Sequence, residues 1–241
     1  SLSTPFFVSN KLNAGAKRDI LFWQESVNKD IPGNMQMIFN GQAARTATVM
    51  VQKKQPYDKL RALGARRDMM HRLGFIYPFK KENEHKAEAL ICTNSDKIEH
   101  CEELVRALPQ MHFHIAALTE MSSKLMGMED YDNVSLYPGA KEDVLDELFA
   151  KCDYYLDINH EAEIASALRR AFLNNHLIFA FHETVHNRDY VAEESIYPAK
   201  EVTRMIEDIQ AAVCGKAVLD ERLRRQRDAA FAESAEKYLN L

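Results

Sequence analysis

The sequence predicts an α/β protein: a Rossmann-like parallel sheet with helices on both faces, plus a smaller α/β segment. Three observations lead to this prediction. Short apolar runs alternate with segments of helical periodicity along nearly all of the 241 residues. The connections between these segments are short, which favours repeated strand–helix units whose strands pair in parallel. The run LIFAF at residues 177–181 is apolar at every position, as expected for a strand in the middle of a parallel sheet.

The alternation is clearest after the polar stretch at residues 80–86. We expect strands at residues 89–92, 113–118, 134–137, 154–158 and 177–181. Between and after these strands, four sets of apolar residues each fall on one helical face. The sets are Ile98, Cys101, Leu104, Val105 and Leu108, ending at Pro109; Val144, Leu145, Leu148 and Phe149; Ile164, Leu168, Ala171 and Phe172; and Val202, Met205, Ile206 and Ile209. A charged final helix is predicted from about residue 219 to residue 238.

The first part of the chain shows the same alternation in a shorter form. We expect strands at residues 6–8, 20–23 and 48–51, and helices near residues 35–39 and 57–63. Because every residue from 80 to 86 is polar, we expect a linker there. The predicted parts are therefore the smaller α/β segment at residues 1–80, a Rossmann-like domain at 87–215 and a C-terminal helix at 216–241.

The composition argues against several classes of protein. With 31 Lys and Arg against 36 Asp and Glu, the chain is mildly acidic, and we expect no nucleic-acid partner. No apolar run has the length of a membrane span, and we expect no signal peptide. The four cysteines form no paired motif and are expected to be buried thiols of a reducing compartment. Only 8 residues are glycine, which is unusual for a protein that holds phosphates with bare backbone.

Polar residues follow the predicted strands, where ligands of open α/β sheets bind. Taken together, they favour a crevice that holds a polar ligand. Taken singly, each is better explained as a loop or capping residue, as Ser95 or Asp96 would be before the helix that carries Ile98. The segments are Thr93-Asn94-Ser95, Thr119-Glu120, Tyr137-Pro138, Asn159-His160-Glu161 and His182-Glu183-Thr184, the last continuing to His186, Asn187 and Arg188.

The sequence lacks the common catalytic motifs and a metal-binding motif. No HExxH, GxSxG, GxGxxG or GxxxxGK[ST] pattern occurs, so we expect no catalytic residue, metal or cofactor. The histidines and acids at 160–163 and 182–186 lack metal-ligand spacing, and hydrogen bonding or packing explains them better. His112 and His114 have no acidic companion nearby in the sequence. The Arg-rich stretch at 222–227 is expected to be a solvated helix face, with membrane or partner docking as the alternative.

Five stretches together resemble a known family. They are DILFWQE at residues 19–25, IPGNMQ at 31–36, ART at 44–46, YLDINH at 155–160 and VHNRDY at 185–190. The resemblance covers nearly the whole chain, and LDINH and VHNRDY are its most specific parts. The family is the stabilising, substrate-binding subunit, of the GtfB type, in the protein O-GlcNAc transferase complex of the accessory Sec system of Gram-positive bacteria.

The resemblance implies a fold, partners and a location. Members have a GT-B architecture of two Rossmann-like halves, and this chain resembles the carboxyl-terminal half with a piece of the preceding half at residues 1–80. Such subunits pair with a catalytic transferase and hold the serine-rich-repeat adhesin polypeptide while the partner transfers N-acetylglucosamine from UDP-GlcNAc to Ser or Thr. The implied location is the cytoplasm, with peripheral attachment to the inner face of the cell membrane as the alternative.

The resemblance also permits a check for a donor-sugar site. Active retaining GT-B transferases carry two glutamates eight positions apart, the second of them before an alanine. Ala171 matches that alanine, which puts Arg170 and Ala162 in the two glutamate positions, and starting from Glu161 or Glu163 does not restore the pair. A guanidinium in place of a ribose-binding carboxylate reverses both charge and hydrogen-bonding sense.

Two further features of a donor site are missing. Of the arginine and lysine that neutralise the diphosphate, Lys97 alone remains, and Asp96 beside it would repel phosphate. The usual glycines before the donor helix are replaced by His-Glu-Ala-Glu at residues 160–163. We therefore expect a degenerate donor site. Its vestigial region consists of Thr93, Asn94, Ser95, Lys97, Glu163 and Arg170.

Two hypotheses follow. The preferred one is a non-catalytic subunit that stabilises a transferase and presents polypeptide to it. The alternative is an active UDP-sugar-dependent glycosyltransferase with a divergent donor site, with Glu161 or Glu163 near the sugar and Lys97 or Arg188 on the phosphates. The candidate substrate-binding residues are Asn159, His160, Glu161, His182, His186, Asn187 and Arg188.

Overall fold

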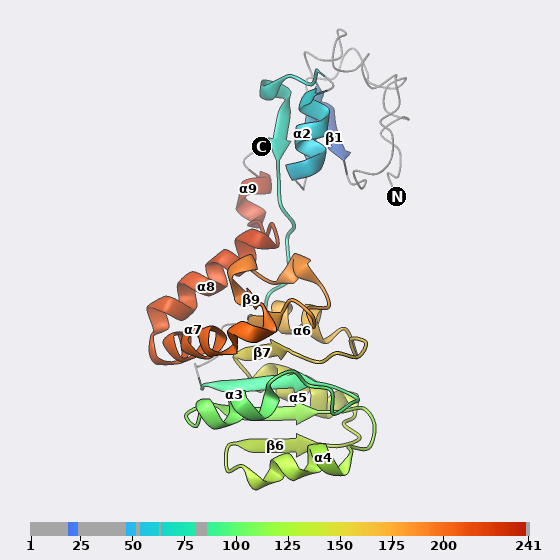
Figure 1. The fold of residues 1–241 in the computed structure, drawn as a ribbon. Helices are drawn as coiled ribbons and strands as arrows, with labels where there is room; N and C mark the ends of the chain where they lie inside the picture. The colour runs from blue at the N-terminus through green and yellow to red at the C-terminus, as the bar shows by residue number, and fades with distance from the viewer. Residues whose placement is uncertain (1–18, 24–46, 52–53, 63, 81–85, 240–241) are drawn as a thin grey trace. The chain divides into compact units, whose positions relative to one another are not determined.

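The computed structural model describes residues 19–23, 47–51, 54–62, 64–80 and 86–239 (Figure 1). The chain forms two compact units, residues 1–76 with 231–241, and residues 77–230. The strand predicted at 6–8 and the helix predicted near 35–39 lie outside the described residues. The predicted division into 1–80, 87–215 and 216–241 stays a prediction.

The first unit contains a three-stranded parallel sheet in the order β1-β2-β3. The strands predicted at residues 20–23 and 48–51 are confirmed, as is the helix predicted at 57–63. β3 was not predicted, because it has three residues and two of them, His71 and Arg72, are exposed. The elements are β1 (Asp19–Trp23), β2 (Ala47–Val51), α2 (Lys54–Ala62), η3 (Arg67–Met69), β3 (Met70–Arg72) and α9 (Ala235–Leu239).

The second unit contains a six-stranded, all-parallel sheet in the order β6-β5-β4-β7-β8-β9. The chain first adds strands on one side of β4 and then crosses to add β7, β8 and β9 on the other side. β4 and β7 therefore lie next to each other at the point where the winding reverses, which is the position of the ligand crevice in doubly wound folds. The strands are β4 (Glu88–Cys92), β5 (His112–Ala116), β6 (Val134–Tyr137), β7 (Tyr154–Asp157), β8 (Leu177–Phe181) and β9 (Ile196–Tyr197).

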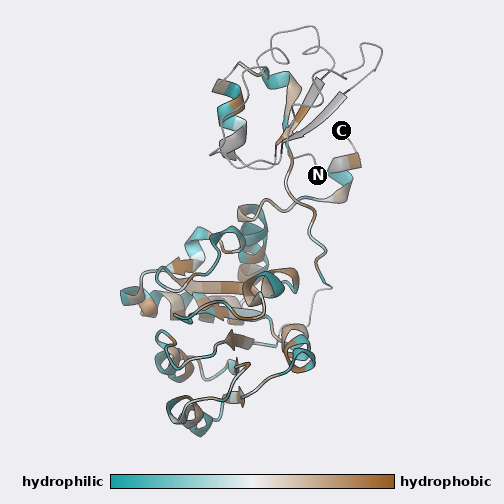
Figure 2. Ribbon diagram, turned by 90° about the vertical axis from the view of Figure 1, so that its right-hand side faces the viewer, coloured by the Kyte–Doolittle hydropathy of each residue, from teal (hydrophilic) through white to brown (hydrophobic). Residues whose placement is uncertain are grey.

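Helices cover both faces of this sheet, as predicted, and the alternation of strand side chains separates two hydrophobic cores. On one face, Ile91 of β4 and Phe179 of β8 pack with residues of α3, α4 and α7. On the other face, Leu90 and Ile178 pack with residues of α5 and α6. Figure 2 shows the apolar residues gathered in the strands of this unit. The helices are α3 (Cys101–Ala107), α4 (Ser123–Met126), α5 (Glu142–Lys151), α6 (Ala167–Leu173), α7 (Val202–Cys214) and α8 (Lys216–Ala229), with 3-10 turns η4 (Gly127–Asp130), η5 (Arg188–Tyr190), η6 (Glu193–Ser195) and η7 (Ala199–Glu201).

Three predictions about local structure are wrong. Ser95 and Asp96 do not cap a helix, because α3 begins at Cys101 after His100 in the left-handed conformation (φ 50°). The single final helix predicted at 219–238 is two helices, α8 and α9, since Phe231 between them has a φ of 54°. Three of the four cysteines are buried as expected, but Cys214 at the end of α7 is exposed.

No helix among the described residues is long and apolar enough to cross a bilayer.

Candidate functional site

The candidate site lies at the carboxyl ends of β4 and β7, where the sheet order reverses. The loop that leaves β4 spans residues 93–100, and the loop that leaves β7 spans residues 158–166. These two loops carry two of the five polar segments predicted to line a crevice. Their geometry therefore decides whether the crevice is open to a ligand.

The two loops pair with each other across the end of the sheet. The Glu99 amide donates to the Ile158 carbonyl at 2.8 Å, and the His160 amide donates to the Lys97 carbonyl at 3.0 Å. Ile98 and Asn159 form an antiparallel bridge between these two bonds. The loop after β4 thus crosses the end of β7. At the switch point, backbone donors and acceptors of the two loops form hydrogen bonds with each other.

Beneath this bridge, Thr93 and Asn159 form a buried polar link. The Thr93 hydroxyl donates to Asn159 Oδ1 at 3.1 Å and accepts from the Ser95 amide at 3.0 Å. Asn159 Oδ1 also accepts from the Glu161 amide at 3.1 Å, which fixes the loop after β7. Both side chains are fully or almost fully buried, so their polar atoms serve the two loops and not solvent.

The Lys97 ammonium and the Glu161 carboxylate form an ion pair at 2.6 Å between the two loops. The pair raises the pKa of Lys97 and lowers the pKa of Glu161, since each charge stabilises the other. Both side chains are exposed, so the pair is a surface contact of small energetic weight. Its chemical effect is that Lys97, the cation predicted to remain of a diphosphate-binding pattern, already faces an anion.

His186 is held between two acceptors and so carries a positive charge. Its Nδ1 donates to Asp157 Oδ1 at 2.6 Å, and its Nε2 donates to the Glu161 carbonyl at 2.7 Å. Asp157 is 1% exposed, and its second oxygen accepts from the His186 amide at 2.8 Å. The Asp157 hydrogen bond raises the pKa of His186 to about 9, against the opposing effect of burial.

The other candidate substrate-binding residues are exposed and have contacts near the same edge. His160 Nε2 lies 2.5 Å from a carboxylate oxygen of Glu99, and Arg188 Nη2 lies 3.1 Å from His182 Nδ1. Arg188 also pairs with Glu193 at 3.3 Å. Asn187 caps η5, its side chain accepting from the Asp189 amide at 2.9 Å.

Three residues of the predicted vestigial region act elsewhere. Glu163 accepts from the Leu168 amide at 2.8 Å and so caps the start of α6. Arg170 pairs with Glu142 and Asp146 of α5, both at 2.9 Å, which joins α6 to α5. Asn94 accepts from the Leu118 amide at 2.9 Å, after β5. The structure thus brings together Thr93, Ser95 and Lys97 with Asn159, Glu161 and His186, but engages Glu163 and Arg170 in helix contacts.

One important residue of this site, Asp157, was not singled out from the sequence. Asp157 anchors His186, and its carbonyl accepts at 2.6 Å from the hydroxyl of Thr184, which was among the polar residues predicted after the strands. A signal for Asp157 existed, because an acid inside the apolar run at 154–158 must be paired if it is buried. Its partner could not be read from the sequence, since it lies 29 residues later in the loop after β8.

The expectation that His114 has no acidic companion is wrong. His114 Nε2 lies 2.9 Å from Glu88 Oε2, which comes from the neighbouring strand β4. Burial lowers the pKa of His114 to about 4, so the imidazole is neutral near pH 7. His112 instead contacts the Ser135 hydroxyl at 2.8 Å.

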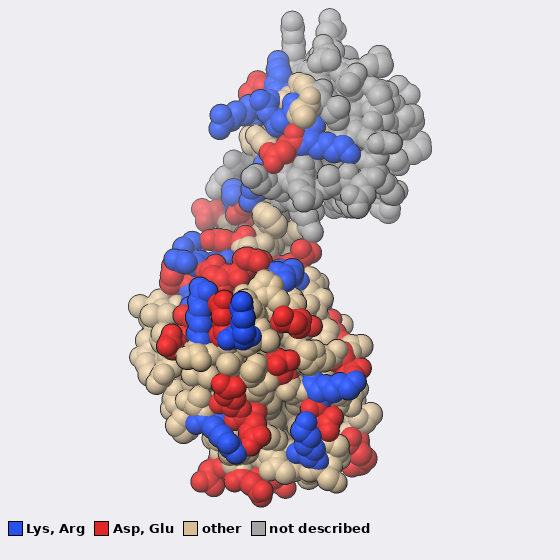
Figure 3. All heavy atoms as spheres, viewed as in Figure 1, with Lys and Arg blue, Asp and Glu red and all other residues tan. Residues whose placement is uncertain are grey.

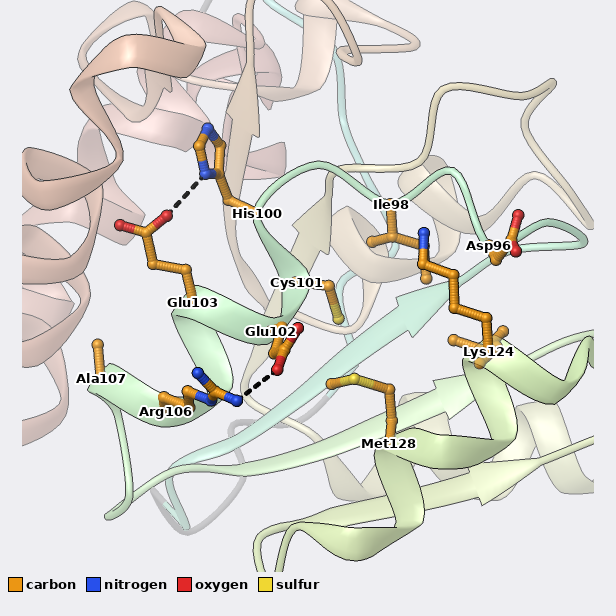
Figure 4. A pocket seen from close by; sticks show the side chains of 11 residues that line it. Asp96, Ile98, His100, Cys101, Glu102, Glu103, Arg106, Ala107, Lys124 and Met128 are labelled. Atoms are coloured by element: carbon orange, nitrogen blue, oxygen red, sulfur yellow. Dashed lines mark hydrogen bonds and ion pairs between the residues drawn. The ribbon is translucent and has the colours of Figure 1, made fainter.

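A pocket of about 670 Å³ lies beside the crevice, between α3 and α4. Its apolar lining includes Ile98, Cys101 and Met128, and Figure 4 shows charged side chains of α3 at its rim. Two pairs of rim side chains are in contact, Arg106 with Glu102 at 2.6 Å and His100 with Glu103 at 2.8 Å.

Both units of the chain are similar to known proteins. The family model described as the GftB/GlyA-F C-terminal domain matches residues 89–226, and the model described as the GtfB third domain matches residues 1–63. The chain is 44% identical over 240 residues to the UDP-N-acetylglucosamine--peptide N-acetylglucosaminyltransferase stabilizing protein GtfB of Streptococcus agalactiae, covering 99% of this chain and 53% of that protein. The chain thus spans about half the length of the curated relatives it matches.

Two further similarities bear on fold and function. A crystal structure of a GtfA/B complex bound to UDP and GlcNAc contains a chain that superposes with a TM-score of 0.84 and 39% identity, covering 100% of this chain and 54% of that one. The glycosyltransferase GlyE of Streptococcus pneumoniae serotype 4 is 30% identical over 136 residues, covering 56% of this chain and 33% of that protein. The predicted fold class, a Rossmann-like parallel sheet within a glycosyltransferase-like architecture, is confirmed.

Proposed function

The chain belongs to the GftB/GlyA-F C-terminal domain family, with GtfB-type stabilising proteins among its relatives, and we propose that it is a non-catalytic, GT-B-like subunit. It would stabilise a partner O-GlcNAc transferase, as the name of the Streptococcus agalactiae relative says of that protein. The proposal takes the partner from relatives that are about twice as long as this chain.

The main observation that supports a non-catalytic role is the hydrogen bonding between the two loops at the switch point. Backbone bonds between Lys97 and His160 and between Glu99 and Ile158 lie where a transferase of this fold would place a nucleotide diphosphate. The two cations at this point, Lys97 and His186, are paired with Glu161 and Asp157. A diphosphate would have to displace these anions before it gained any charge neutralisation.

The proposal extends to the polypeptide that is glycosylated. A serine-rich-repeat chain offers backbone amides and hydroxyl groups, which suit side chains that can both donate and accept. The exposed residues His160, His182, Asn187 and Arg188 would contact it, and Arg188 would supply the strongest donor. Asn159 is 2% exposed, so its part would be to hold the loop that presents His160. Peripheral membrane association stays a prediction.

A second function, an active UDP-sugar transferase, is favoured by one observation: the relative GlyE is named a glycosyltransferase. The groups that this reading needs are engaged in other contacts. Glu161 faces Lys97, and Glu163 caps α6. We therefore prefer the stabilising function.

The stabilising function is tested by mixing the chain with the catalytic O-GlcNAc transferase and measuring the midpoint of thermal unfolding of the transferase. Binding to the folded state predicts a rise in midpoint that grows with the concentration of the chain. The same mixture, given UDP-GlcNAc and a serine-rich-repeat peptide, should glycosylate the peptide faster than the transferase alone.

Two variants make the test specific. Arg188→Ala should weaken peptide capture by about tenfold, the loss of one charge-assisted hydrogen bond. Arg204→Ala removes another exposed, ion-paired arginine, this one from α7, and should leave capture unchanged. An unchanged unfolding midpoint of the transferase at every concentration of the chain would refute the stabilising function.

A further inference from the structure

A second cluster of polar side chains lies at the opposite end of the sheet from the crevice. Glu88 is the first residue of β4, His114 lies on β5, and Cys152 directly follows α5. One donor atom from each side chain lies within 4.8 Å of the others. Among the residues that the structure describes, these form the only group of three or more His, Cys, Asp or Glu side chains so arranged.

The cluster is largely shielded from solvent. His114 is 1% exposed and Cys152 is fully buried, whereas the Glu88 side chain is 16% exposed. Potential metal ligands that are buried in this way are held in place by the packing around them, whereas acidic side chains on a surface are not. Leu90, Cys92 and Phe149 belong to the same core face as Cys152 and fix the positions of β4 and α5 around it.

A neighbouring side chain orients the imidazole. Tyr137, the last residue of β6, places its hydroxyl 2.9 Å from His114 Nδ1. The other ring nitrogen, Nε2, is then directed at Glu88 Oε2, 2.9 Å away. A hydrogen bond to the far nitrogen of a histidine is the arrangement that orients imidazole ligands in metal sites.

A positive charge already lies beside two of the three side chains. The Lys151 ammonium is 2.8 Å from Glu88 Oε2 and 3.3 Å from His114 Nε2. Its side chain is 47% exposed, so it can turn into solvent without disturbing the core. The cluster thus already binds one cation, the Lys151 ammonium. Lys151 is also the most exposed of the four side chains.

We propose that Glu88, His114 and Cys152 form a zinc site in which Zn²⁺ replaces the Lys151 ammonium. Thiolate, imidazole and carboxylate are ligands that zinc prefers, at distances of about 2.0–2.3 Å, and three protein ligands leave a fourth position for water. Binding releases the Cys152 thiol proton to solvent, and the thiolate and carboxylate then balance the two charges of the ion. The bound ion ties the end of α5 to β4 and β5. This site is independent of the proposed function.

The test is a titration with Co²⁺, a spectroscopic substitute for zinc, followed by competition with Zn²⁺. It uses the Cys214→Ser chain, because the exposed Cys214 thiol could bind metal on its own. The proposal predicts a thiolate-to-cobalt absorption band that Zn²⁺ removes. Cys152→Ser and His114→Gln should abolish the band, and Cys101→Ser, which removes another buried thiol, should leave it unchanged.

Two variants keep all three ligands and so separate metal binding from misfolding. Tyr137→Phe should weaken zinc affinity by about 10- to 100-fold, the usual effect of removing such a hydrogen bond. Lys151→Met should tighten it by roughly threefold to tenfold, because a competing surface cation is lost. Absence of a thiolate band, its persistence in Cys152→Ser, or no change in affinity in both Tyr137→Phe and Lys151→Met would overturn the proposal.

Discussion

At the scale of single residues, His186 links the three segments of the candidate site. It connects the end of β7 through Asp157, the loop after β7 through the Glu161 carbonyl, and the loop after β8 through its own backbone. The sequence placed Asn159, Glu161 and His186 near one another because all three follow strands of one parallel sheet. It could not predict that these residues would form hydrogen bonds within and between the loops that carry them. Those bonds depend on the paths of the loops, which apolar periodicity does not encode.

The charge on His186 predicts how stability depends on pH. Its folded pKa of about 9 lies above the ordinary value of 6.5, so protonation favours the folded state. This contribution is fully present below pH 6.5, is lost as the pH rises through 9, and corresponds to roughly 3 kcal/mol at most. His186→Gln should therefore cost most near pH 6 and little above pH 9, measured as the free energy of unfolding in urea.

The matched control for this prediction is His182→Gln, which removes an exposed imidazole after the same strand. Its stability should run parallel to that of the unsubstituted chain across the pH range. A cost of His186→Gln that is equal at pH 6 and pH 9.5 would show that His186 is not charged in the folded chain.

At the scale of elements, the sequence predicted five of the six strands of the second unit and missed β9, which has only two residues. It predicted the surroundings of α8 poorly. LIFAF became β8 with the same boundaries, because a continuously apolar run has few other places in a fold. The stretch at 222–227 was expected to be solvated, and Arg224 and Arg225 do form exposed pairs with Glu221. Figure 3 shows blue and red side chains interleaved on the drawn face of this unit. Gln226 and Arg222 depart from the prediction.

Arg222 and Gln226 lie against the sheet. Arg222 pairs with Asp208 of α7 at 2.6 Å with 16% of its side chain exposed. Gln226 is 1% exposed, its Nε2 donates to the His176 carbonyl at 2.8 Å, and its Oε1 accepts from the Ile178 amide at 2.9 Å. β9 pairs with β8 only at Ala180 and Phe181, so Gln226 satisfies backbone atoms near the start of β8 that β9 does not cover. Helical periodicity cannot predict such a residue, because a buried glutamine breaks the apolar pattern.

Replacing Gln226 tests this role. Gln226→Leu keeps the volume but leaves one backbone donor and one acceptor buried without a partner, so we expect a loss of about 2–4 kcal/mol in unfolding free energy. Gln210→Ala, at an exposed position of α7, is the matched control and should change stability by less than about 0.5 kcal/mol. Equal stability of the two variants in chemical denaturation would contradict the assignment.

At the scale of the whole chain, the sequence predicted the fold class from the alternation of runs, and the scarcity of glycine pointed to the loops around the candidate site. In place of glycine, the loops after β4 and β7 carry larger residues. Hydrogen bonds and an ion pair between these residues join the two loops. The zinc cluster was outside the reach of the sequence, since Glu88, His114 and Cys152 come from three elements.

The most direct measurement of the central claim is a calorimetric titration of the chain with UDP. A switch point whose two loops are hydrogen-bonded to each other, with Lys97 and His186 already paired, predicts no saturable binding up to millimolar nucleotide. Saturable binding at micromolar UDP that Lys97→Ala weakens would contradict the claim, because it would show that the switch point still holds a diphosphate.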